Sequence, residues 1–311
     1  MRFWVIKMTI SRIKLEDFLV FKNMEVISSL GINVFIGRNG VGKTQLMKAV
    51  YAHIVNMNDM EVPFSEYFKR GGNSRLLQMS KVKPLVHIEF VKADRENKAV
   101  FIPVKDMLTH AKGLLSMEEK YREFPFDRTL TDIIRLANQW TLKEPPQLAL
   151  SILPKLEEIM DGTVEIENDE FFIRKHDGTL VNFAVEAEGL KKIGLFWQLL
   201  MNENITENSI LLWDEPEANL NPEYLPVVVE CLLELARHNV QIFVSTHNYL
   251  FAKYFDVRRK QADNVMYHSL YRENEDVHCE TKEYFADLHH NAIMDAYNKL
   301  LDEVYGLQVG D

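Results

Sequence analysis

The chain has 311 residues, of which 47% are hydrophobic, and its formal charge of −10 reflects 36 Lys and Arg against 46 Asp and Glu. This length allows one large domain or two small ones, and the acidic balance removes the simplest argument for nucleic-acid binding without forbidding it. The two cysteines, Cys231 and Cys279, are too few for a disulfide framework. The first residues are too short an apolar run for a signal peptide, and no run approaches the ~18 apolar residues of a membrane span. We therefore expect a cytoplasmic protein without a membrane partner.

Two strands are predicted near the start of the chain. Apolar and polar residues alternate over 8–21, and a turn there leads to a second short strand over 24–27. Phe18, Phe21 or Lys22 could lie near a nucleotide base, although a core or edge position is the more ordinary interpretation of each. A mostly apolar strand is then predicted over 32–36.

A phosphate-binding loop follows this strand. Residues 37–44 have the sequence GRNGVGKT, which fits G-x-x-x-x-G-K-[ST], and an amphipathic helix comes next. The glycines let backbone N–H groups point inward to hold phosphate oxygens at the positive end of the helix dipole. Lys43 would reach the β- and γ-phosphates, and the Thr44 hydroxyl would hold Mg²⁺. The candidate nucleotide-binding residues are Gly37, Arg38, Asn39, Gly40, Val41, Gly42, Lys43, Thr44 and Gln45.

The middle of the chain is predicted to change from strands to helices and back. Strands over 86–90 and 99–102 precede a segment, about 105–160, in which apolar residues recur at helical spacing. We interpret this segment as a helical insertion of mixed charge, which could form a partner surface or a lid. An antiparallel meander over 164–183 and a buried helix over about 189–201 are expected after it.

A second chemical centre follows the apolar strand over 209–213. This strand delivers Asp214 and Glu215 at its C-terminal end, where ligands of open α/β sheets bind. Because alternate side chains of a strand point to opposite sides, one carboxylate can face a metal while the other faces a phosphate. A solvated strand exit is the ordinary alternative.

The remaining elements are predicted from caps and apolar runs. Asn221 and Pro222 predict a helix start, and a strand over 240–244 leads to His247. A strand pair (about 264–282) and a helix (about 291–305) close the chain.

These motifs resemble the ATP-binding-cassette (ABC) class of P-loop ATPases. The resemblance rests on ISRIKLEDFLVFKN over 10–23, INVFIGRNGVGKT over 32–44, ILLWDEPEANLNP over 210–222 and Thr246-His247. The branch is the SMC/RecF/OLD-like one, catalogued as AAA-15 or AAA-21 ATPases. It implies an α/β fold in one domain, 1–311: a mixed sheet flanked by helices, an antiparallel β-lobe, the helical insertion, and a C-terminal strand pair plus helix over about 262–311.

The resemblance also implies roles for individual residues. Asp214 and Thr44 would hold Mg²⁺, and Glu215 would be the general base. His247 would contact the γ-phosphate as the switch histidine, and Lys43 would stabilise the transferred phosphoryl group. Phosphoryl transfer needs mainly positioning and charge neutralisation, which these groups would supply.

The chain departs from the family at the Leu-Ser-Gly-Gly-Gln signature, where residues 185–192 have the sequence VEAEGLKK. Gly189 could offer its N–H to a γ-phosphate across a dimer, while Glu188 would repel that phosphate unless it is paired. Lys191 or Lys192 could supply charge in trans, as an arginine finger does. A solvated helix start is an equally good interpretation of the two lysines.

The glutamine loop of the family is also ambiguous. Gln78 is one candidate, and the residues over 103–106 are the favoured one because they follow a strand.

The resemblance implies an ATPase head that binds ATP and Mg²⁺ and closes on a second protomer, in a homodimer or higher oligomer. SMC coiled-coil arms and an OLD-type Toprim domain have no counterpart, so a separate effector protein such as a nuclease is expected. Stand-alone ATPase subunits of prokaryotic anti-phage defence systems work in this way. Two alternatives stay open: a RecF-like DNA-repair ATPase that clamps DNA, and a nucleotide-sensing scaffold with little turnover. A transporter cassette is disfavoured by the altered signature and the long insertion.

Overall fold

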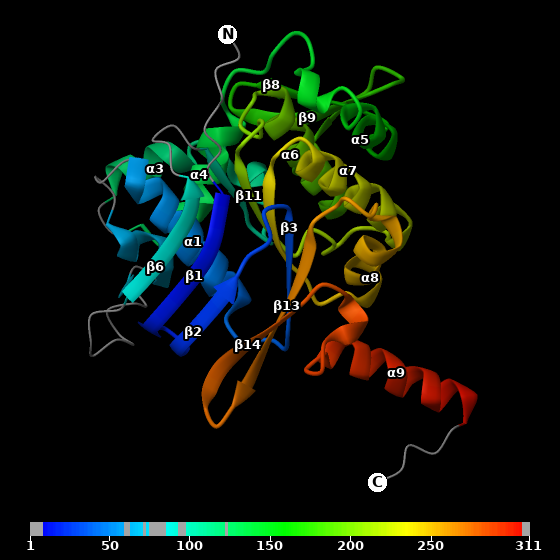
Figure 1. The fold of residues 1–311 in the computed structure, drawn as a ribbon. Helices are drawn as coiled ribbons and strands as arrows, with labels where there is room; N and C mark the ends of the chain where they lie inside the picture. The colour runs from blue at the N-terminus through cyan, green and yellow to red at the C-terminus, as the bar shows by residue number, and fades with distance from the viewer. Residues whose placement is uncertain are drawn as a thin grey trace, which may run out of the picture.

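The computed structural model describes residues 9–58, 63–70, 73–74, 85–92, 98–121 and 124–306. At its centre is a six-stranded sheet of order β14-β13-β3-β12-β11-β7 (Figure 1). Its strands are β3 (Ile32–Ile36), β7 (Ala99–Ile102), β11 (Ile210–Asp214), β12 (Gln241–Ser245), β13 (Val265–Glu273) and β14 (Asp276–Lys282). Only the β13–β14 pairing is antiparallel, so the predicted mixed sheet is confirmed.

The register of the central strands brings three chain segments to one edge of the sheet. Asp214 pairs with Ser245, and Ser245 pairs with Phe35, all in parallel strands. The segments that follow β3, β11 and β12 therefore leave the sheet side by side. β3, β11 and β12 are buried throughout, as expected for parallel strands that are covered on both faces.

An antiparallel sheet covers one face of the molecule. It has the order β2-β1-β6 and consists of β1 (Thr9–Phe18), β2 (Phe21–Ile27) and β6 (Leu85–Lys92). Helix α1 (Lys43–Asn58) lies between this sheet and the central one (Figure 1), because its apolar residues share one core with both. The predicted early strands and the helix after the loop are confirmed.

The opposite face of the central sheet is covered by helices and by the insertion. The helices are α6 (Glu188–Met201), α7 (Leu225–Arg237) and α8 (Tyr249–Arg258). The insertion contains η2 (Leu108–His110), α3 (Leu114–Lys120), α4 (Arg128–Ala137), η3 (Gln147–Ala149) and α5 (Leu153–Met160). The predicted helical character of about 105–160 is therefore confirmed, and α6 is buried as expected.

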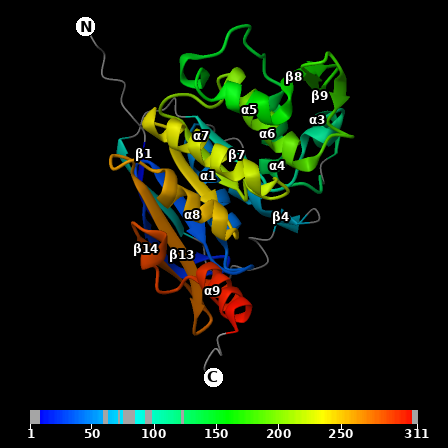
Figure 2. The same ribbon diagram turned by 90° about the vertical axis from the view of Figure 1, so that its right-hand side faces the viewer.

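The predicted meander is a separate antiparallel sheet of order β10-β9-β8. Its strands are β8 (Gly162–Glu167), β9 (Glu170–Lys175) and β10 (Leu180–Asn182). In Figure 2 it lies with the insertion at one end of the molecule, and α9 (Ala292–Tyr305) lies at the other. The remaining short elements are η1 (Phe64–Phe68), β4 (Lys69–Arg70), β5 (Asn73–Ser74), η4 (Pro222–Tyr224) and η5 (Phe285–Asp287).

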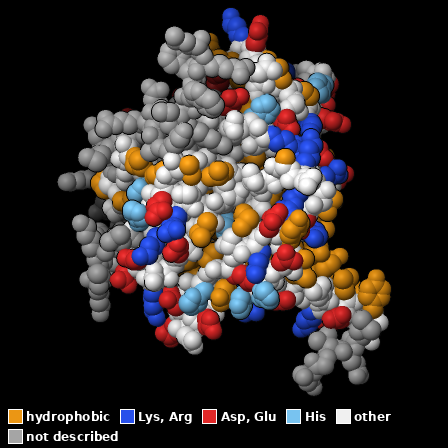
Figure 3. All heavy atoms as spheres, in the orientation of Figure 1, with side chains coloured by type: hydrophobic (Ala, Val, Ile, Leu, Met, Phe, Trp, Pro, Cys, Tyr) orange, Lys and Arg blue, Asp and Glu red, His pale blue; other side chains and the backbone are white. Residues whose placement is uncertain are grey.

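The surface is mixed in character. On the face shown in Figure 3, acidic and basic side chains are interspersed, and apolar side chains gather on the projecting α9. There Leu300, Val304 and Tyr305 are 54%, 67% and 73% exposed. None of the described helices is long and apolar enough to span a membrane.

Candidate nucleotide site

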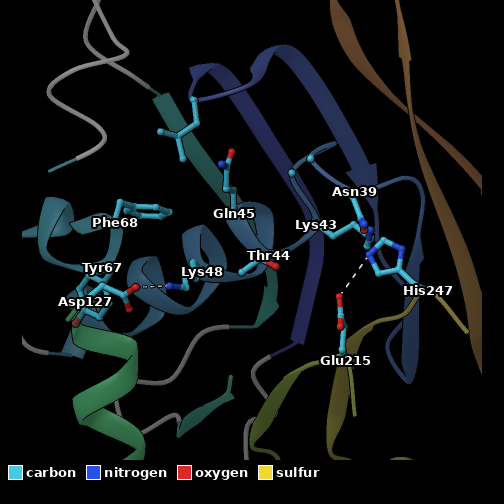
Figure 4. Close-up of a pocket in the computed structure, with 13 residues that line it drawn as sticks. Asn39, Lys43, Thr44, Gln45, Lys48, Tyr67, Phe68, Asp127, Glu215 and His247 are labelled. Carbon is cyan, nitrogen blue, oxygen red and sulfur yellow. Dashed lines mark hydrogen bonds and ion pairs between the residues drawn. The ribbon is translucent and has the colours of Figure 1, made fainter. Parts of the chain in front are cut away.

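A cavity of about 390 Å³ opens where the segments after β3, β11 and β12 meet. Figure 4 shows the side chains that face it, with Lys43 and Thr44 between Glu215 and His247 on one side and Lys48 and Asp127 on the other. Its lining residues are Leu19, Asn39, Gly40, Gly42, Lys43, Thr44, Gln45, Lys48, Tyr67, Phe68, Asp127, Glu215 and His247. Residues from both predicted chemical centres therefore surround one space.

The turn between β1 and β2 packs directly on the phosphate-binding loop. Gly42 has φ +104°, and a Cβ atom there would lie 2.5 Å from Phe21 Cζ and 2.7 Å from Val20 Cγ2. Glycine is thus required both by the left-handed backbone and by this close approach. Phe18 and Phe21 are core residues with 0% and 1% exposure, so the ordinary interpretation holds for both. Leu19 reaches the cavity instead.

Lys43 is buried beneath the loop. Its Nζ donates to the backbone O of Gly37 at 2.7 Å and to that of Arg38 at 3.3 Å. Burial lowers the pKa of Lys43 to about 8, while Asp214 and Glu215 oppose that shift. A phosphate in the cavity would favour the charged ammonium further.

The oxygens of Thr44 and Asp214 form a pair that suits a magnesium ion. Thr44 Oγ1 donates to Asp214 Oδ2 at 2.7 Å, and the Ser245 hydroxyl donates to Asp214 Oδ1. Hydroxyl and carboxylate oxygens are the ligands that Mg²⁺ prefers, together with substrate phosphates. The donor set therefore fits the ion, and Thr44 and Asp214 could hold it beside the loop.

Glu215 lies in the loop after β11 and His247 in the loop after β12, and their side chains face each other. Glu215 Oε1 lies 3.4 Å from His247 Nε2 (Figure 4). Burial raises the pKa of Glu215, and the Asp214 charge adds to this rise. Burial and the Lys43 charge lower the pKa of His247. The lowered pKa favours the neutral imidazole, so the contact joins a carboxylate of increased basicity to a ring that takes up a proton less readily.

The far wall of the cavity comes from segments that sequence reasoning did not select. Lys48 Nζ lies 2.5 Å from Asp127 Oδ2, and Tyr67 and Phe68 complete the wall. Lys48 follows Thr44 by four residues, which places both on one helix face. Asp127 caps α4 by accepting from Thr129 N, so a helix-start pattern was the available signal.

The predicted loop residues divide into two groups. Asn39, Gly40 and Lys43 line the cavity with Gly42, Thr44 and Gln45. The Oε1 atom of Gln45 is buried without a hydrogen-bond partner among the described residues, which leaves an acceptor for a ligand. The other group, Gly37, Arg38 and Val41, lines a second hollow of about 390 Å³ toward β13 and α9.

The residues around Gly189 do not line the cavity. Lys191 is 4% exposed and its Nζ lies 2.6 Å from Glu188 Oε1, so Glu188 is paired. Lys192 is 5% exposed; the interpretation of both lysines as a solvated helix start is therefore wrong. Gly189 packs on the loop after β11, where a Cβ atom would lie 2.5 Å from Asn219 O.

Of the two candidates for the glutamine loop, the structure describes only the residues over 103–106. Gln78 lies outside the described residues. The residues over 103–106 follow β7, the parallel neighbour of β11, but they do not line the cavity. Asp106 instead accepts from Leu108 N at 2.9 Å and caps the next turn.

Comparison with known proteins agrees with this geometry. The family model described as "AAA domain, putative AbiEii toxin, Type IV TA system" (AAA_21) matches residues 81–252, more than half of the chain. Protein ea59 of Escherichia phage lambda is 27% identical over 254 residues, which cover 71% of this chain and 46% of that protein. The chain thus spans about half the length of this curated relative.

Two solved structures share the fold. One is the Smc head domain with an extended coiled coil from Pyrococcus furiosus, bound to the C-terminal domain of ScpA. It matches this chain with a TM-score of 0.51 at 10% identity, and the match covers 96% of this chain and 100% of the Smc head. The other is an SmcHead bound to the C-winged helix domain of ScpA, with a TM-score of 0.51 at 13% identity, covering 88% and 97%. The chain belongs to the AAA_21 family, and its fold is that of an ABC-class P-loop ATPase of the SMC-head type.

Proposed function

We propose that this chain binds and hydrolyses ATP. The observation that carries the proposal is the convergence of three loops on one cavity. The loop after β3 leads into the first turn of α1, which supplies Lys43 and Thr44; the loop after β11 supplies Glu215 and the loop after β12 supplies His247. Asp214, the last residue of β11, is bonded to Thr44 beside the cavity. Phosphate-binding, metal-holding and proton-accepting groups are thus available together, which is what phosphoryl transfer to water requires.

Each residue has a role that its surroundings support. Lys43 and the loop N–H groups would bind the β- and γ-phosphates. Thr44 and Asp214 would hold Mg²⁺, which when bound neutralises phosphate charge. Glu215 would accept the proton of the attacking water, a task that its raised pKa favours. His247 would contact the γ-phosphate and orient Glu215.

The proposal extends to a second protomer. Residues 187–192, at the start of α6, would close over the nucleotide of a partner copy in a homodimer or higher oligomer. Gly189 and Lys191, which are buried in this protomer, would have to become exposed to reach that nucleotide. The Pyrococcus furiosus Smc head of similar fold was solved with bound ScpA, which supports partner binding by heads of this kind. On the face shown in Figure 3, acidic and basic side chains are interspersed, which gives no particular support to DNA as that partner.

We further propose that ATP-driven closure controls a separate effector, such as a nuclease, in anti-phage defence in the cytoplasm. The family description names a putative toxin of a type IV toxin–antitoxin system, and the curated relative is a phage protein. Both support a role in conflict between phage and host. Fold-level analogy supplies the rest of this step.

The test is phosphate release from ATP by the wild type, by Lys43→Ala and by Lys112→Ala. Lys112 is an exposed ion-pairing lysine that does not line the cavity. We expect the wild type to hydrolyse ATP in the presence of Mg²⁺. Lys43→Ala should reduce this turnover by at least about 100-fold, because a preorganised charge is lost. Lys112→Ala should leave the turnover unchanged. Absence of turnover in the wild type, or equal turnover in Lys43→Ala, would contradict the proposal. Stimulation by duplex DNA would favour a DNA clamp over effector control.

A further inference from the structure

Glu217 lies two residues beyond Glu215 and does not line the cavity. Its side chain is buried, with 8% exposure. Oε1 of Glu217 accepts a hydrogen bond from Thr246 Oγ1 at 2.6 Å and another from His247 N at 3.2 Å. Glu217 Oε1, in the loop after β11, therefore fixes the loop after β12 at Thr246 and at the backbone of His247.

Lys192 holds the other end of the same loop. Its Nζ, in the first turns of α6, donates to the backbone O of Glu215 at 2.8 Å. Glu215 has φ +47°, a left-handed conformation that non-glycine residues seldom adopt. The same carbonyl oxygen accepts from Ala218 N at 3.1 Å. The backbone that presents the Glu215 carboxylate is thus fixed from two directions.

The charges of these groups depend on one another. Burial raises the pKa of Glu217, and its bonds from Thr246 and His247 oppose the rise. Burial lowers the pKa of Lys192, and Glu217 is first among the carboxylates that oppose this. The carboxylates of Glu217, Glu215 and Asp214 together favour the charged ammonium of Lys192.

Burying the Glu217 carboxylate costs free energy that a side chain with a packing role alone would not cost. Its Oε2 atom is buried and has no hydrogen-bond partner among the described residues. A buried acceptor without a partner is unfavourable, and a neutral side chain could pack here without it. Such local conflicts are typical of functional positions.

We propose that Glu217 is a positioning residue for ATP hydrolysis, and that with Lys192 it forms a clasp that fixes Glu215 and His247 relative to each other. The two functional side chains come from different loops, so their 3.4 Å separation depends on what joins those loops. The clasp consists of Lys192, the Glu215 backbone, Glu217, Thr246 and the His247 backbone. This inference rests on the proposed ATPase function.

The test compares Glu217→Ala with Glu217→Gln in steady-state ATP hydrolysis. Alanine removes the acceptor, and we expect kcat to fall between about 10-fold and 100-fold while KM for ATP changes less than about threefold. Glutamine keeps an acceptor oxygen in the same place, so kcat should return to within about fivefold of wild type. Thr246→Val removes the hydroxyl donor from the opposite side and should lower kcat in the same way.

Glu157→Ala is the matched control. Glu157 Oε1, in α5 of the insertion, accepts from Trp197 Nε1 of α6 at 2.9 Å, and neither residue lines the cavity. This variant should lower the melting temperature but leave kcat at the wild-type value. It separates loss of a half-buried acceptor that bonds α6 from loss of the clasp.

Several outcomes would overturn the inference. These are wild-type kcat in Glu217→Ala, or an equal fall in Glu217→Ala and Glu217→Gln. If Glu217→Ala does not fold, Thr246→Val decides: a lowered kcat at unchanged KM supports the clasp, and a wild-type kcat overturns it. A wild-type protein that releases no phosphate would overturn the proposed function and the clasp together, whereas active wild type with an unaffected Glu217→Ala overturns the clasp alone.

Discussion

His268 is a buried histidine in the centre of β13. It is 0% exposed, its Nε2 lies 3.1 Å from Asn33 Oδ1, and its Nδ1 lies 2.9 Å from Thr281 Oγ1. Its ring stacks on Phe35, with centroids 4.9 Å apart. Burial lowers the pKa of His268 to about 3, so the folded protein keeps a neutral imidazole next to the strand that leads to the phosphate-binding loop.

This histidine predicts a pH dependence of stability. Its folded pKa lies below the ordinary value of 6.5, so the unfolded state binds a proton first as pH falls. The contribution is complete above about pH 6.5 and is lost progressively toward pH 3. At about 1.4 kcal/mol per unit, the free energy of unfolding should fall by about 2 kcal/mol from this group between pH 6.5 and 5.

Urea unfolding between pH 7.5 and 5 measures this effect. His268→Gln keeps a polar side chain that does not titrate and should reduce the slope, whereas the same change at exposed His110 should not. Equal slopes in wild type and His268→Gln would show that His268 is not the group responsible.

Sequence motifs predicted the site where chemistry is tied to spacing along the chain. The loop 37–44 and the carboxylates Asp214 and Glu215 are recognisable because a strand must deliver each to the sheet edge. Lys48, Asp127 and Glu217 were missed because their positions depend on packing between elements far apart in the chain. The assigned roles of all these residues remain predictions.

At the scale of elements, the insertion docks on the loop helix through polar contacts. Besides the pair of Lys48 and Asp127, Tyr51 OH donates to Asp132 Oδ2 at 3.1 Å. Arg128 Nε lies 2.7 Å from Asp132 Oδ1. Helix α4 thus touches α1 one turn beyond Thr44, beside the cavity. The pattern of apolar residues predicted the helices of the insertion but carried no information about this docking.

Substitutions of Asp127 separate its two roles. Asp127→Ala removes the cap of α4 and leaves the Lys48 ammonium, whose side chain is 15% exposed, without its carboxylate, so the free energy of unfolding should fall by about 2 kcal/mol. Asp127→Asn keeps a capping oxygen and should cost about 1 kcal/mol less. Chemical denaturation measures both changes.

Asp177→Ala serves as the comparison for Asp127. Asp177 accepts from Thr179 N at 2.8 Å in an exposed turn, and its loss should leave unfolding close to that of wild type. A stability of Asp127→Ala within about 0.5 kcal/mol of wild type would show that the docking contact contributes nothing measurable.

Helix α6 links two segments of one protomer that the proposed dimer would place at different nucleotides. Residues 187–192 would meet the partner's nucleotide, and Glu215 would meet the nucleotide of its own protomer. Its first turns pack on the loop after β11 at Gly189 and bind the Glu215 carbonyl through Lys192. A movement of residues 187–192 toward a partner's nucleotide would therefore shift the Glu215 backbone of the same protomer. The sequence pattern could not predict this, because it places the two lysines on a helix without showing that both are buried.

At the scale of the whole molecule, the ATPase fold was predictable because alternating and apolar runs fixed the strands and helices in order. Family resemblance supplied the mixed sheet, which the structure confirms, but the order of its strands came from the structure alone. Oligomer, effector and biological role depend on surfaces whose partners lie outside this chain. They remain proposals.

The most direct test of the account is the substitution Glu215→Gln, studied with ATP and Mg²⁺. Phosphate release and solution mass should be measured together for wild type, for Glu215→Gln and for the exposed-site control Glu207→Gln. We expect Glu215→Gln to bind ATP, to release phosphate at least about 100-fold more slowly, and to accumulate a larger assembly than wild type or the control, because closure persists when ATP is not consumed. Equal turnover and equal mass in all three proteins would contradict the account, since Glu215 would then be neither the base nor the trigger for opening a dimer.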